Sequence, residues 1–306
     1  MKMIKKLAKY IFDADYRFLI DARDGKYDHL TDEEYLKRKY KASLHKELNL
    51  DDPKTFNEKL QWLKLNDRNP EYVKMVDKHA VKQFVSDIIG EEYIIPTLGV
   101  WDSFDDIDFD SLPNQFVLKC THDSGGLAIC RDKSKFDVQT AKRKIEKALA
   151  SDFYLHSREW PYKEVPRKII AEAYMEDSET GELRDYKFFC FGGEPKALFV
   201  ATDRYVAGEE TKFDFFDMDY KHIDVRNGHP NAEVFPAKPK MFDQMKRLAK
   251  KLSQGIPHVR VDFYEVNGKV YFGELTFYHF SGLVKFDPEE WDYTFGEWIE
   301  LPRKSN

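Results

Sequence analysis

The sequence predicts an α+β protein in which helices come first and a strand-rich region follows. Two capping boxes, beginning at Thr31 and Thr55, each precede apolar residues at helical spacing. Short β-rich runs separated by turn residues begin near Tyr93. Asn267-Gly268 separates the last two runs, and both residues tolerate the positive φ of a two-residue hairpin turn.

The helical part contains three predicted helices before residue 91. Each capping box places a glutamate three residues after its threonine, at Glu34 and Glu58, where the side chain can reach back to the cap. We expect the third helix to run without a break over 69–90. Asn69 can cap its start, Pro70 suits the first turn, and a glycine follows its last apolar residue.

The strand-rich part should form a sheet interrupted by two helices. The β-rich runs that we predict as strands are 92–95, 115–120, 127–130, 168–174, 186–191 and 196–200. The interrupting helices are expected over 138–150 and 239–254. A hairpin of strands 259–266 and 269–277 closes the chain.

Composition restricts the class of protein. Hydrophobic residues make up 42% and charged residues 34% of the 306 residues, which argues against disorder and favours a two- or three-part α/β enzyme. The formal net charge of −6 argues against a general nucleic-acid binder, which would need a basic surface. Cys120, Cys130 and Cys190 form no CxxC pair, and an odd number cannot close a disulfide framework. We therefore expect reduced thiols in a cytoplasmic protein.

The first twelve residues are basic and amphipathic. They contain neither a continuous apolar segment nor a small-residue cleavage site, so we expect no signal peptide and no membrane span. Such a helix can make weak peripheral contact with an anionic membrane, although ordinary surface helices also have this pattern.

The closing hairpin carries polar residues that can meet on one face. Arg260 and Asp262 alternate on its first strand and Glu274 and Thr276 on its second, so each pair shares a face. If the two faces coincide, two carboxylates and a guanidinium come together. Paired carboxylates on rigid strands suit Mg²⁺, which prefers oxygen ligands and commonly keeps substrate phosphates in its shell. The alternative is a cross-strand salt bridge on an exposed face.

Two further segments suit a nucleotide, although each has an ordinary structural alternative. Lys119 ends a strand and the glycine-bearing loop to Gly126 follows, which would place a positive charge and backbone N–H groups near phosphates. A plain hairpin turn is the alternative. Glu172 is the one acid of a β-rich run that could precede an adenine-binding edge, or it could lie on a wet face. The chain has no GxxxxGK[ST] or GxGxxG motif, so P-loop and Rossmann sites lack their required residues.

The order of these features resembles the ATP-grasp superfamily, and the closer resemblance is to its TupA-like branch. That branch is associated with teichuronopeptide and capsular polysaccharide biosynthesis. The resemblance spans the chain from about residue 15 to its end. The segments that carry it are Pro53–Trp62, Asp77-Lys78, Leu112-Pro113, Phe116–Lys119, Arg184–Phe188, Val259–Phe263 and Gly273–Phe277.

The resemblance implies an ATP-grasp fold, in which two α+β subdomains clasp ATP, with a helical N-terminal extension. Residues 1–66 would form the extension, 67–171 a lead-in and the first subdomain with the phosphate loop, and 172–306 the second subdomain with the metal site. The residues that would bind the nucleotide are Lys78, Lys119, Ser124, Gly125, Gly126, Glu172, Tyr174, Asp185 and Lys187.

The resemblance also implies that Mg²⁺ binds to Asp262, Glu274 and Thr276. Arg260 and Lys119 would be catalytic, and Arg260 would stabilise negative charge that develops on oxygen. The third metal position is often asparagine in ATP-grasp enzymes, and Thr276 stands there in this chain. A threonine hydroxyl can coordinate Mg²⁺ directly or hold a ligated water.

The implied activity is that of an ATP- and Mg²⁺-dependent carboxylate–amine ligase in capsular polysaccharide biosynthesis. It would form an amide on a uronic-acid or amino-acid carboxylate through an acyl phosphate. Its partners would be ATP, a carboxylate-bearing saccharide or amino-acid acceptor and an amine, with no nucleic acid. Arg204, Arg226 and His229 are candidates for contact with the acceptor carboxylate.

Two other functions remain open at this point. A glycosyltransferase would use Asp217-Met218-Asp219 as a DxD motif that holds a metal and a sugar diphosphate, whereas short acidic motifs of this kind are often turns. A binding protein could also have kept the fold and lost catalysis.

Overall fold

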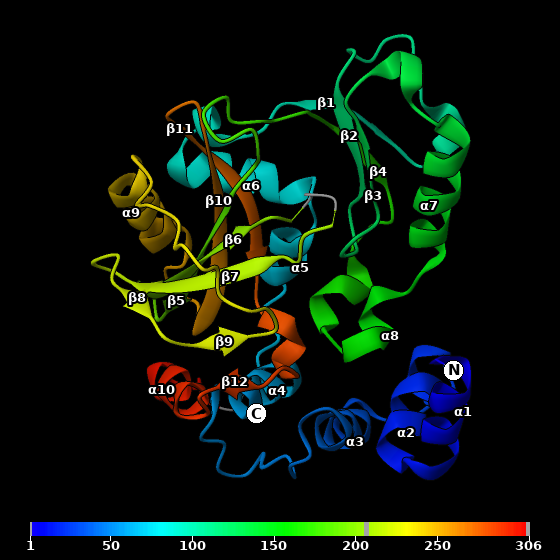
Figure 1. Cartoon of the computed structure of the whole chain (residues 1–306), viewed down its shortest axis with the longest axis vertical. Coiled ribbons are helices and arrows are strands. Elements are labelled where there is room, and N and C mark those ends of the chain that lie inside the picture. Colours follow the sequence, from blue (N-terminus) through cyan, green and yellow to red (C-terminus); the bar gives the residue numbers. More distant parts are fainter. Residues whose placement is uncertain (1, 205–207, 304–306) are drawn as a thin grey trace.

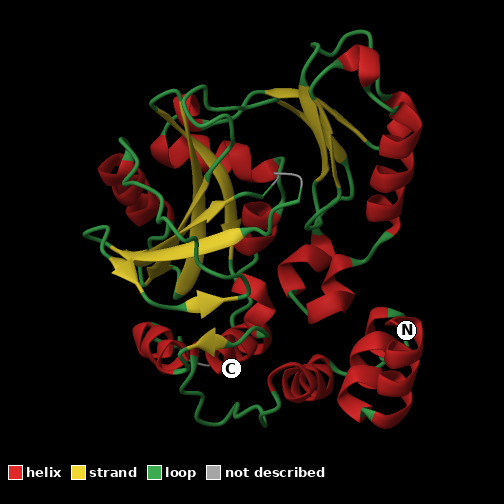
Figure 2. Cartoon of the chain, viewed as in Figure 1, coloured by secondary structure: helices red, strands yellow, loops and turns green. Residues whose placement is uncertain are grey.

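The structure, a computed structural model, describes residues 2–204 and 208–303. Two β-sheets form the centres of two lobes, and the helices of the N-terminal extension lie together at one end of the molecule (Figure 1). Figure 2 shows how helices surround the larger sheet and one long helix lies along the smaller sheet. None of the helices in the described ranges is long and apolar enough to cross a membrane.

The smaller sheet has four antiparallel strands in the order β1-β4-β2-β3. These are β1 (Thr97–Trp101), β2 (Phe116–Cys120), β3 (Leu127–Cys130) and β4 (Ile169–Ala173). The helix α7 (Val138–Ala150) packs on the face of this sheet that buries alternate residues of β2. The intervening residues of β2 therefore point toward the other lobe.

The larger sheet has the strand order β11-β10-β5-β6-β7-β8. Its strands are β5 (Asp185–Phe191), β6 (Glu194–Thr202), β7 (Lys212–Asp217), β8 (His222–Ile223), β10 (His258–Val266) and β11 (Lys269–Thr276). Adjacent residues of β5 are buried on opposite sides: Phe188 packs against α9 (Phe242–Leu252), whereas Phe189 packs against Phe56 and Phe295. The sheet is therefore covered on both faces at β5, and every residue of this strand is buried.

The N-terminal extension consists of α1 (Lys2–Phe12), α2 (Ala14–Arg23), α3 (Asp32–Leu44) and α4 (Phe56–Asn66). Both predicted capping boxes are confirmed, because each threonine accepts from the N–H of its glutamate and each glutamate side chain reaches back to the cap. The last helix, α10 (Glu290–Trp298), packs against α4.

The uninterrupted helix expected over 69–90 is wrong, because the structure has two helices, α5 (Glu71–Val76) and α6 (Ala80–Ile89). Asp77 adopts an extended conformation between them, and its Oδ1 atom accepts from the N–H groups of His79 and Ala80. The carboxylate thus competes with the helical backbone and starts a second helix. This break leaves Lys78 outside both helices.

The strand expected over 92–95 is also wrong. Residues Glu91–Tyr93 form the 3₁₀ helix η1, and the strand β1 begins later, at Thr97. Pro96 separates the two segments, and it has no N–H to donate to a sheet ladder. The ladder with β4 therefore starts beyond the proline.

The predicted hairpin at Asn267-Gly268 is confirmed. Its two turn residues have φ of 51° and 73°, and they join β10 to β11. The register pairs Arg260 with Thr276 and Asp262 with Glu274 directly across the two strands.

The remaining elements are short. They are α8 (Phe153–Ser157), the 3₁₀ helices η2 (Phe104–Asp106), η3 (Lys133–Lys135), η4 (Trp160–Glu164) and η5 (His279–Gly282), and the strands β9 (Arg226–Asn227) and β12 (Phe286–Asp287). The strands β9 and β12 pair as a separate two-stranded sheet. Two residues separate the end of β11 from the segment η5, which packs against α4.

Candidate functional site

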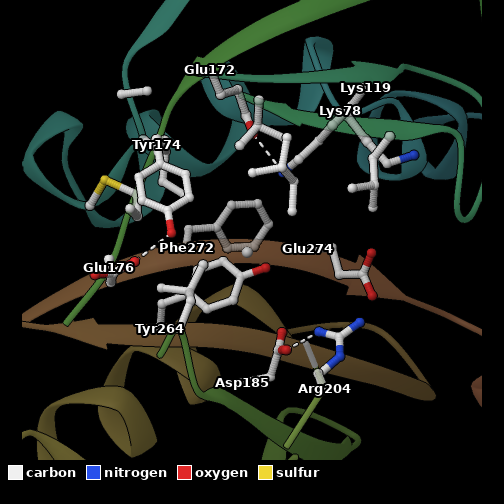
Figure 3. A pocket seen from close by; sticks show the side chains of 18 of the residues that line it. Lys78, Lys119, Glu172, Tyr174, Glu176, Asp185, Arg204, Tyr264, Phe272 and Glu274 are labelled. Carbon is white, nitrogen blue, oxygen red and sulfur yellow. Dashed lines mark hydrogen bonds and ion pairs between the residues drawn. The ribbon is translucent and has the colours of Figure 1, made fainter. Parts of the chain in front are cut away.

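A cavity of about 400 Å³ lies between the two sheets (Figure 3). Strands β2, β3 and β4 line one side of it, and β5, β10 and β11 line the other. The loops 123–126 and 174–183 also contribute lining residues, as do Lys78, Arg204 and the first turn of α6. Both lobes therefore contribute residues to a single site.

Three charged side chains form an ion-pair cluster on the wall made by the smaller sheet. The buried carboxylate of Glu172 accepts at both oxygens: Lys82 Nζ lies 2.6 Å from Oε1, and Lys119 Nζ lies 2.6 Å from Oε2. Burial acts to raise the pKa of Glu172, but the two ammonium groups outweigh it and hold that pKa below its usual value. Two cations around one anion make this wall attractive to phosphate oxygens.

Lys78 and the loop after β2 hold each other in place. Lys78 Nζ donates to the carbonyl of Cys120 at 3.0 Å and to the carbonyl of Asp123, and it lies 3.6 Å from Asp123 Oδ1. Asp123 Oδ2 in turn accepts from the N–H of Gly126 at 2.8 Å. The break between α5 and α6 thus brings a third lysine, in addition to Lys82 and Lys119, to the cavity.

The glycines of this loop are required by geometry. A Cβ on Gly126 would lie 2.1 Å from Asp123 Oδ2 and 2.5 Å from the Cβ of Ala148. Gly125 has φ of 102°, a conformation that residues with a side chain rarely adopt. Ser124 and Gly125 are exposed and line the cavity.

Aromatic rings dominate the other end of the cavity. Tyr174, Tyr264 and Phe272 line it together, and the hydroxyl of Tyr174 donates to Glu176 at 2.5 Å (Figure 3). Flat apolar surfaces of this kind suit a planar base. Asp185 lies nearby.

Asp185 is buried at the floor of the cavity. Its Oδ1 atom lies 3.1 Å from Lys187 Nζ, and its Oδ2 atom pairs with Arg204. Burial opposes ionisation, but these two cations keep the pKa of Asp185 below its usual value.

The hairpin residues meet in one hydrogen-bonded cluster. Arg260 donates from Nε to Asp262 Oδ1 at 2.7 Å and from one terminal nitrogen to Asp262 Oδ2 at 2.8 Å. The same nitrogen donates to Glu274 Oε1 at 2.9 Å and to Thr276 Oγ1 at 3.0 Å. Arg260 and Asp262 are buried, so the expected alternative of an exposed surface salt bridge does not describe this cluster.

Glu274 is the carboxylate of this cluster that faces the cavity. Its side chain is 46% exposed, whereas that of Asp262 is 1% exposed. The strand β11 has a bulge at Gly273, between the pairs Asp262–Glu274 and Phe263–Phe272. A bulge of this kind changes the direction of the neighbouring side chain, here that of Glu274. Partial desolvation inside the site acts to raise the pKa of Glu274, but the Lys187 and Arg260 cations outweigh it and hold that pKa well below its usual value.

The oxygen atoms of this cluster fit a cation. The ammonium of Lys187 lies among three carboxylates, in contact with Asp262 Oδ2, 3.1 Å from Asp185 and 3.9 Å from Glu274. Carboxylate and hydroxyl oxygens are the ligands that Mg²⁺ prefers. Within residues 2–204 and 208–303, no three acidic, histidine or cysteine side chains are arranged to hold a metal, so other oxygens would have to complete its shell.

The structure distributes the predicted site residues over two layers. Those that line the cavity are Lys78, Lys119, Ser124, Gly125, Gly126, Glu172, Tyr174, Asp185, Lys187 and Glu274. The second layer consists of Arg260, Asp262 and Thr276, which do not line the cavity. Arg260 contacts the lining residue Glu274, and Asp262 contacts the lining residue Lys187.

The acceptor candidates are separated in the structure. Arg204 lines the cavity beside Asp185. Arg226 lies on the surface, 3.8 Å from Asp287, and the ring of His229 packs on Phe213. The structure does not bring these three together.

The DxD candidate belongs to a turn. Asp217 Oδ1 accepts from the N–H groups of Asp219 and Lys221, both at 2.9 Å. Neither aspartate lines the cavity. The carboxylate of Asp217 therefore stabilises the turn after β7.

Lys82 was missed by the sequence analysis, although it completes the Glu172 cluster. It lies four residues after Lys78, a spacing that would have placed both lysines on one face of an uninterrupted helix. His279 and Asn227, which extend the Arg260 cluster, had no motif or spacing to indicate them.

One comparison with known proteins matches a family. A protein-family model described as TupA-like ATPgrasp matches residues 58–300. No curated protein matches the chain.

Solved structures with low sequence identity share similarity with this chain. A D-alanine–D-alanine ligase from Bacillus anthracis, complexed with ATP, is 13% identical, with 66% of this chain and 53% of that chain covered and a TM-score of 0.38. The same kind of ligase from Helicobacter pylori is 11% identical, with 83% and 68% covered and a TM-score of 0.44. A RimK domain protein ATP-grasp from Sphaerobacter thermophilus is 11% identical, with 76% and 70% covered and a TM-score of 0.41. The chain spans about half the length of the first of these.

Proposed function

Because the chain belongs to the TupA-like ATP-grasp family, we propose that it is a Mg²⁺- and ATP-dependent carboxylate–amine ligase. The observation that carries the proposal is a single cavity with lysines at one wall, aromatic rings at one end and the Glu274 carboxylate opposite the lysines. Such a cavity can hold a base, a polyphosphate and a cation at once.

The lysines of the smaller sheet would bind the phosphates. Lys78 and Lys119 supply charge, and the loop Ser124-Gly125-Gly126 supplies backbone N–H groups. Glu172 would hold the ammonium of Lys119 in place before the nucleotide binds, because Lys82 in turn fixes the carboxylate of Glu172. Tyr174 and the neighbouring rings would take the adenine, and Asp185 the ribose hydroxyls.

Asp262, Glu274 and Thr276 would hold Mg²⁺ once Lys187 withdraws from Asp262. When bound, the ion neutralises phosphate charge during transfer. Lys187 could then turn its ammonium toward the phosphates, because its side chain lines the same cavity. Arg260 fixes the two carboxylates from behind.

The reaction proceeds in two displacements. A carboxylate oxygen of the acceptor attacks the γ-phosphorus, the bond from that phosphorus to the bridging oxygen breaks, and ADP leaves. The amine nitrogen then attacks the acyl carbon, phosphate leaves with the bond electrons, and the amine proton passes to solvent. The lysines that line the cavity stabilise the negative charge that grows on oxygen in both steps, and Arg260 contributes by holding Asp262 and Glu274 in place.

The acceptor proposed here is a uronic-acid or amino-acid carboxylate of a surface polysaccharide, handled in the cytoplasm where ATP is supplied. This part of the proposal is supported by the TupA-like family alone. Mass spectrometry of mixtures of uronic-acid glycans, amino acids and a panel of amines with enzyme, ATP and Mg²⁺ tests it. The expected product is 18 mass units lighter than the sum of acceptor and amine, as amide formation by loss of water requires.

The nucleotide distinguishes this ligase from a glycosyltransferase. The Tm should rise when ATP or ADP is added with Mg²⁺, because a ligand that binds only the folded state stabilises that state. Stabilisation by UDP-type ligands with Mn²⁺ instead would contradict the proposal. A protein that neither binds nor cleaves ATP would point to a binding role.

We also propose weak contact between α1 and an anionic membrane surface. Leu7, Ile11 and Phe12 of this helix are 60%, 53% and 86% exposed, and its sequence contains four lysines and no acid. The fraction of protein that sediments with anionic vesicles should be lower for Phe12→Ser than for wild type. The control Val234→Ser should leave it unchanged, because Val234 is 85% exposed but lies outside α1. Equal binding of both variants would contradict this contact.

A further inference from the structure

The guanidinium of Arg260 is held on two sides. One side carries the bonds to Asp262, Glu274 and Thr276 described above. On the other side, the Nη1 atom of Arg260 lies 2.7 Å from Nδ1 of His279. The imidazole is 2% exposed and follows β11 by three residues, so it approaches Arg260 from the protein interior.

The hydrogen bonds of His279 define one tautomer. A guanidinium can only donate, so Nδ1 of His279 must carry a lone pair and accept from Arg260. The other ring nitrogen, Nε2, lies 2.8 Å from Oδ1 of Asn227, which can only accept. The ring is therefore neutral with its proton on Nε2.

The amide of Asn227 is oriented in turn by the backbone. Its Nδ2 atom donates to the carbonyl of Lys285 at 3.1 Å and lies 3.4 Å from the carbonyl of Val284. Those two acceptors fix which amide atom faces His279. Asn227 is 1% exposed, so no part of this chain of bonds relies on solvent.

The loop that carries His279 is itself firmly held. Phe280 and Ser281 have φ of 47° and 56°, conformations that cost free energy for residues with a side chain and persist only where the surroundings fix them. Nε2 of Gln61 donates to the carbonyls of Ser281 and Gly282, both at 2.9 Å. The N-terminal extension thus anchors the segment beside Arg260.

We propose that His279 and Asn227 are positioning residues that set the orientation of Arg260 and, through it, the arrangement of Asp262 and Glu274. A neutral acceptor directs one edge of the guanidinium without taking its charge away from the two carboxylates. The role in catalysis rests on the proposed function, whereas the hydrogen-bond chain does not.

The buried His258 provides a matched control. It is also 2% exposed and lies on β10, two residues before Arg260, but its Nδ1 atom lies 3.0 Å from the carbonyl of Cys190 and its ring packs among Phe56, Phe189 and Phe191. Its replacement should affect stability and leave turnover of the folded protein unchanged.

A double-mutant cycle on Mg²⁺-dependent ATP cleavage in the presence of acceptor tests the role. His279→Leu should lower kcat by about 10- to 100-fold, as loss of an outer partner of a metal site does, while the Kd for MgATP changes less than about 3-fold. His279→Asn should recover part of the loss, since its amide oxygen can replace Nδ1 as acceptor. His258→Leu should retain wild-type kcat.

The decisive comparison uses the Arg260→Lys background. If His279 acts through Arg260, His279→Leu adds no more than about a 2-fold loss there, because coupled residues are not additive. A full 10- to 100-fold loss in both backgrounds would overturn the proposal.

A ¹⁵N spectrum of the histidine rings at pH 7.5 tests the chain of bonds without any activity. His279 should show a proton on Nε2 only in the wild-type protein, and a proton on Nδ1 would overturn the arrangement. A wild-type protein that cleaves no ATP with any acceptor would contradict the proposed function, and the spectrum would still decide on His279.

Discussion

The Nζ atom of Lys119 lies 2.6 Å from Oε2 of Glu172, although the two residues are on different strands of the smaller sheet. Lys119 should exchange this carboxylate for ATP phosphates when nucleotide binds. We expect Lys119→Ala to weaken MgATP binding by about 10- to 100-fold, since one hydrogen bond to a charged group contributes about 1.5–3 kcal/mol.

Isothermal titration calorimetry measures this change, with Lys168→Ala as the control. Lys168 carries the same charge and directly precedes β4, the strand that pairs with β2, but its ammonium pairs with Asp102 on the surface, 2.8 Å away. Its removal should leave MgATP affinity nearly unchanged. Unchanged affinity for Lys119→Ala, together with a large drop in Tm, would make Lys119 a structural residue.

Asp262 and Glu274 should differ in how their loss affects the protein. Both Asp262→Asn and Glu274→Gln should abolish turnover, because each removes a proposed Mg²⁺ ligand. Asp262→Asn should destabilise the fold more than Glu274→Gln, because it leaves two buried cations without the anion that they share. The side chain of Glu274 is 46% exposed, so water can solvate the groups that its loss leaves unpaired.

Urea unfolding and steady-state kinetics separate the two effects. Near-normal turnover of either variant at ordinary Mg²⁺ concentrations would remove that residue from the metal site. A Glu274→Gln variant that unfolds as readily as Asp262→Asn would show that the hairpin cluster serves stability.

Gly126→Ala should disturb the phosphate loop because the added methyl group has no room beside Asp123 and Ala148. We expect weaker MgATP binding and a lower Tm. Gly255→Ala is the control: its φ of 75° imposes backbone strain, but the added Cβ would meet no atom within 4 Å. Loss of MgATP affinity in the control as well would refute a local effect of the loop.

Stability should rise with pH through Lys64. This lysine is fully buried on α4, and burial lowers its pKa to about 7, against about 10.4 in an unfolded chain. Between those values the unfolded state binds the extra proton, so the free energy of unfolding increases with pH. From pH 7.5 to 9, wild type should gain about 1–2 kcal/mol relative to Lys64→Met. A constant difference in urea unfolding would contradict this titration.

Local patterns in the sequence were sufficient for much of the fold. The capping boxes and the Asn-Gly turn are properties of neighbouring residues, and each was confirmed. The break at Asp77 was not predicted, because the apolar spacing over 69–90 continues through it. The break comes from the carboxylate of Asp77, which accepts from a backbone N–H group just before α6, and apolar spacing does not show such a bond.

The site was less accessible to sequence reasoning. The shared faces of β10 and β11 follow from strand alternation, so the meeting of Arg260, Asp262 and Glu274 could be anticipated. The contact of Arg260 with His279, and that of His279 with Asn227 on β9, depend on how η5 folds back. The spacing of apolar and polar residues along the sequence does not predict such contacts between distant segments.

The most direct test of the ligase is transfer of oxygen from the acceptor to phosphate. The acceptor carboxylate is labelled with ¹⁸O and incubated with enzyme, ATP, Mg²⁺ and an amine, and the released phosphate is analysed by mass spectrometry. An acyl-phosphate route predicts phosphate heavier by 2 mass units, formed in step with the amide. Unlabelled phosphate, or AMP and pyrophosphate in place of ADP, would contradict it.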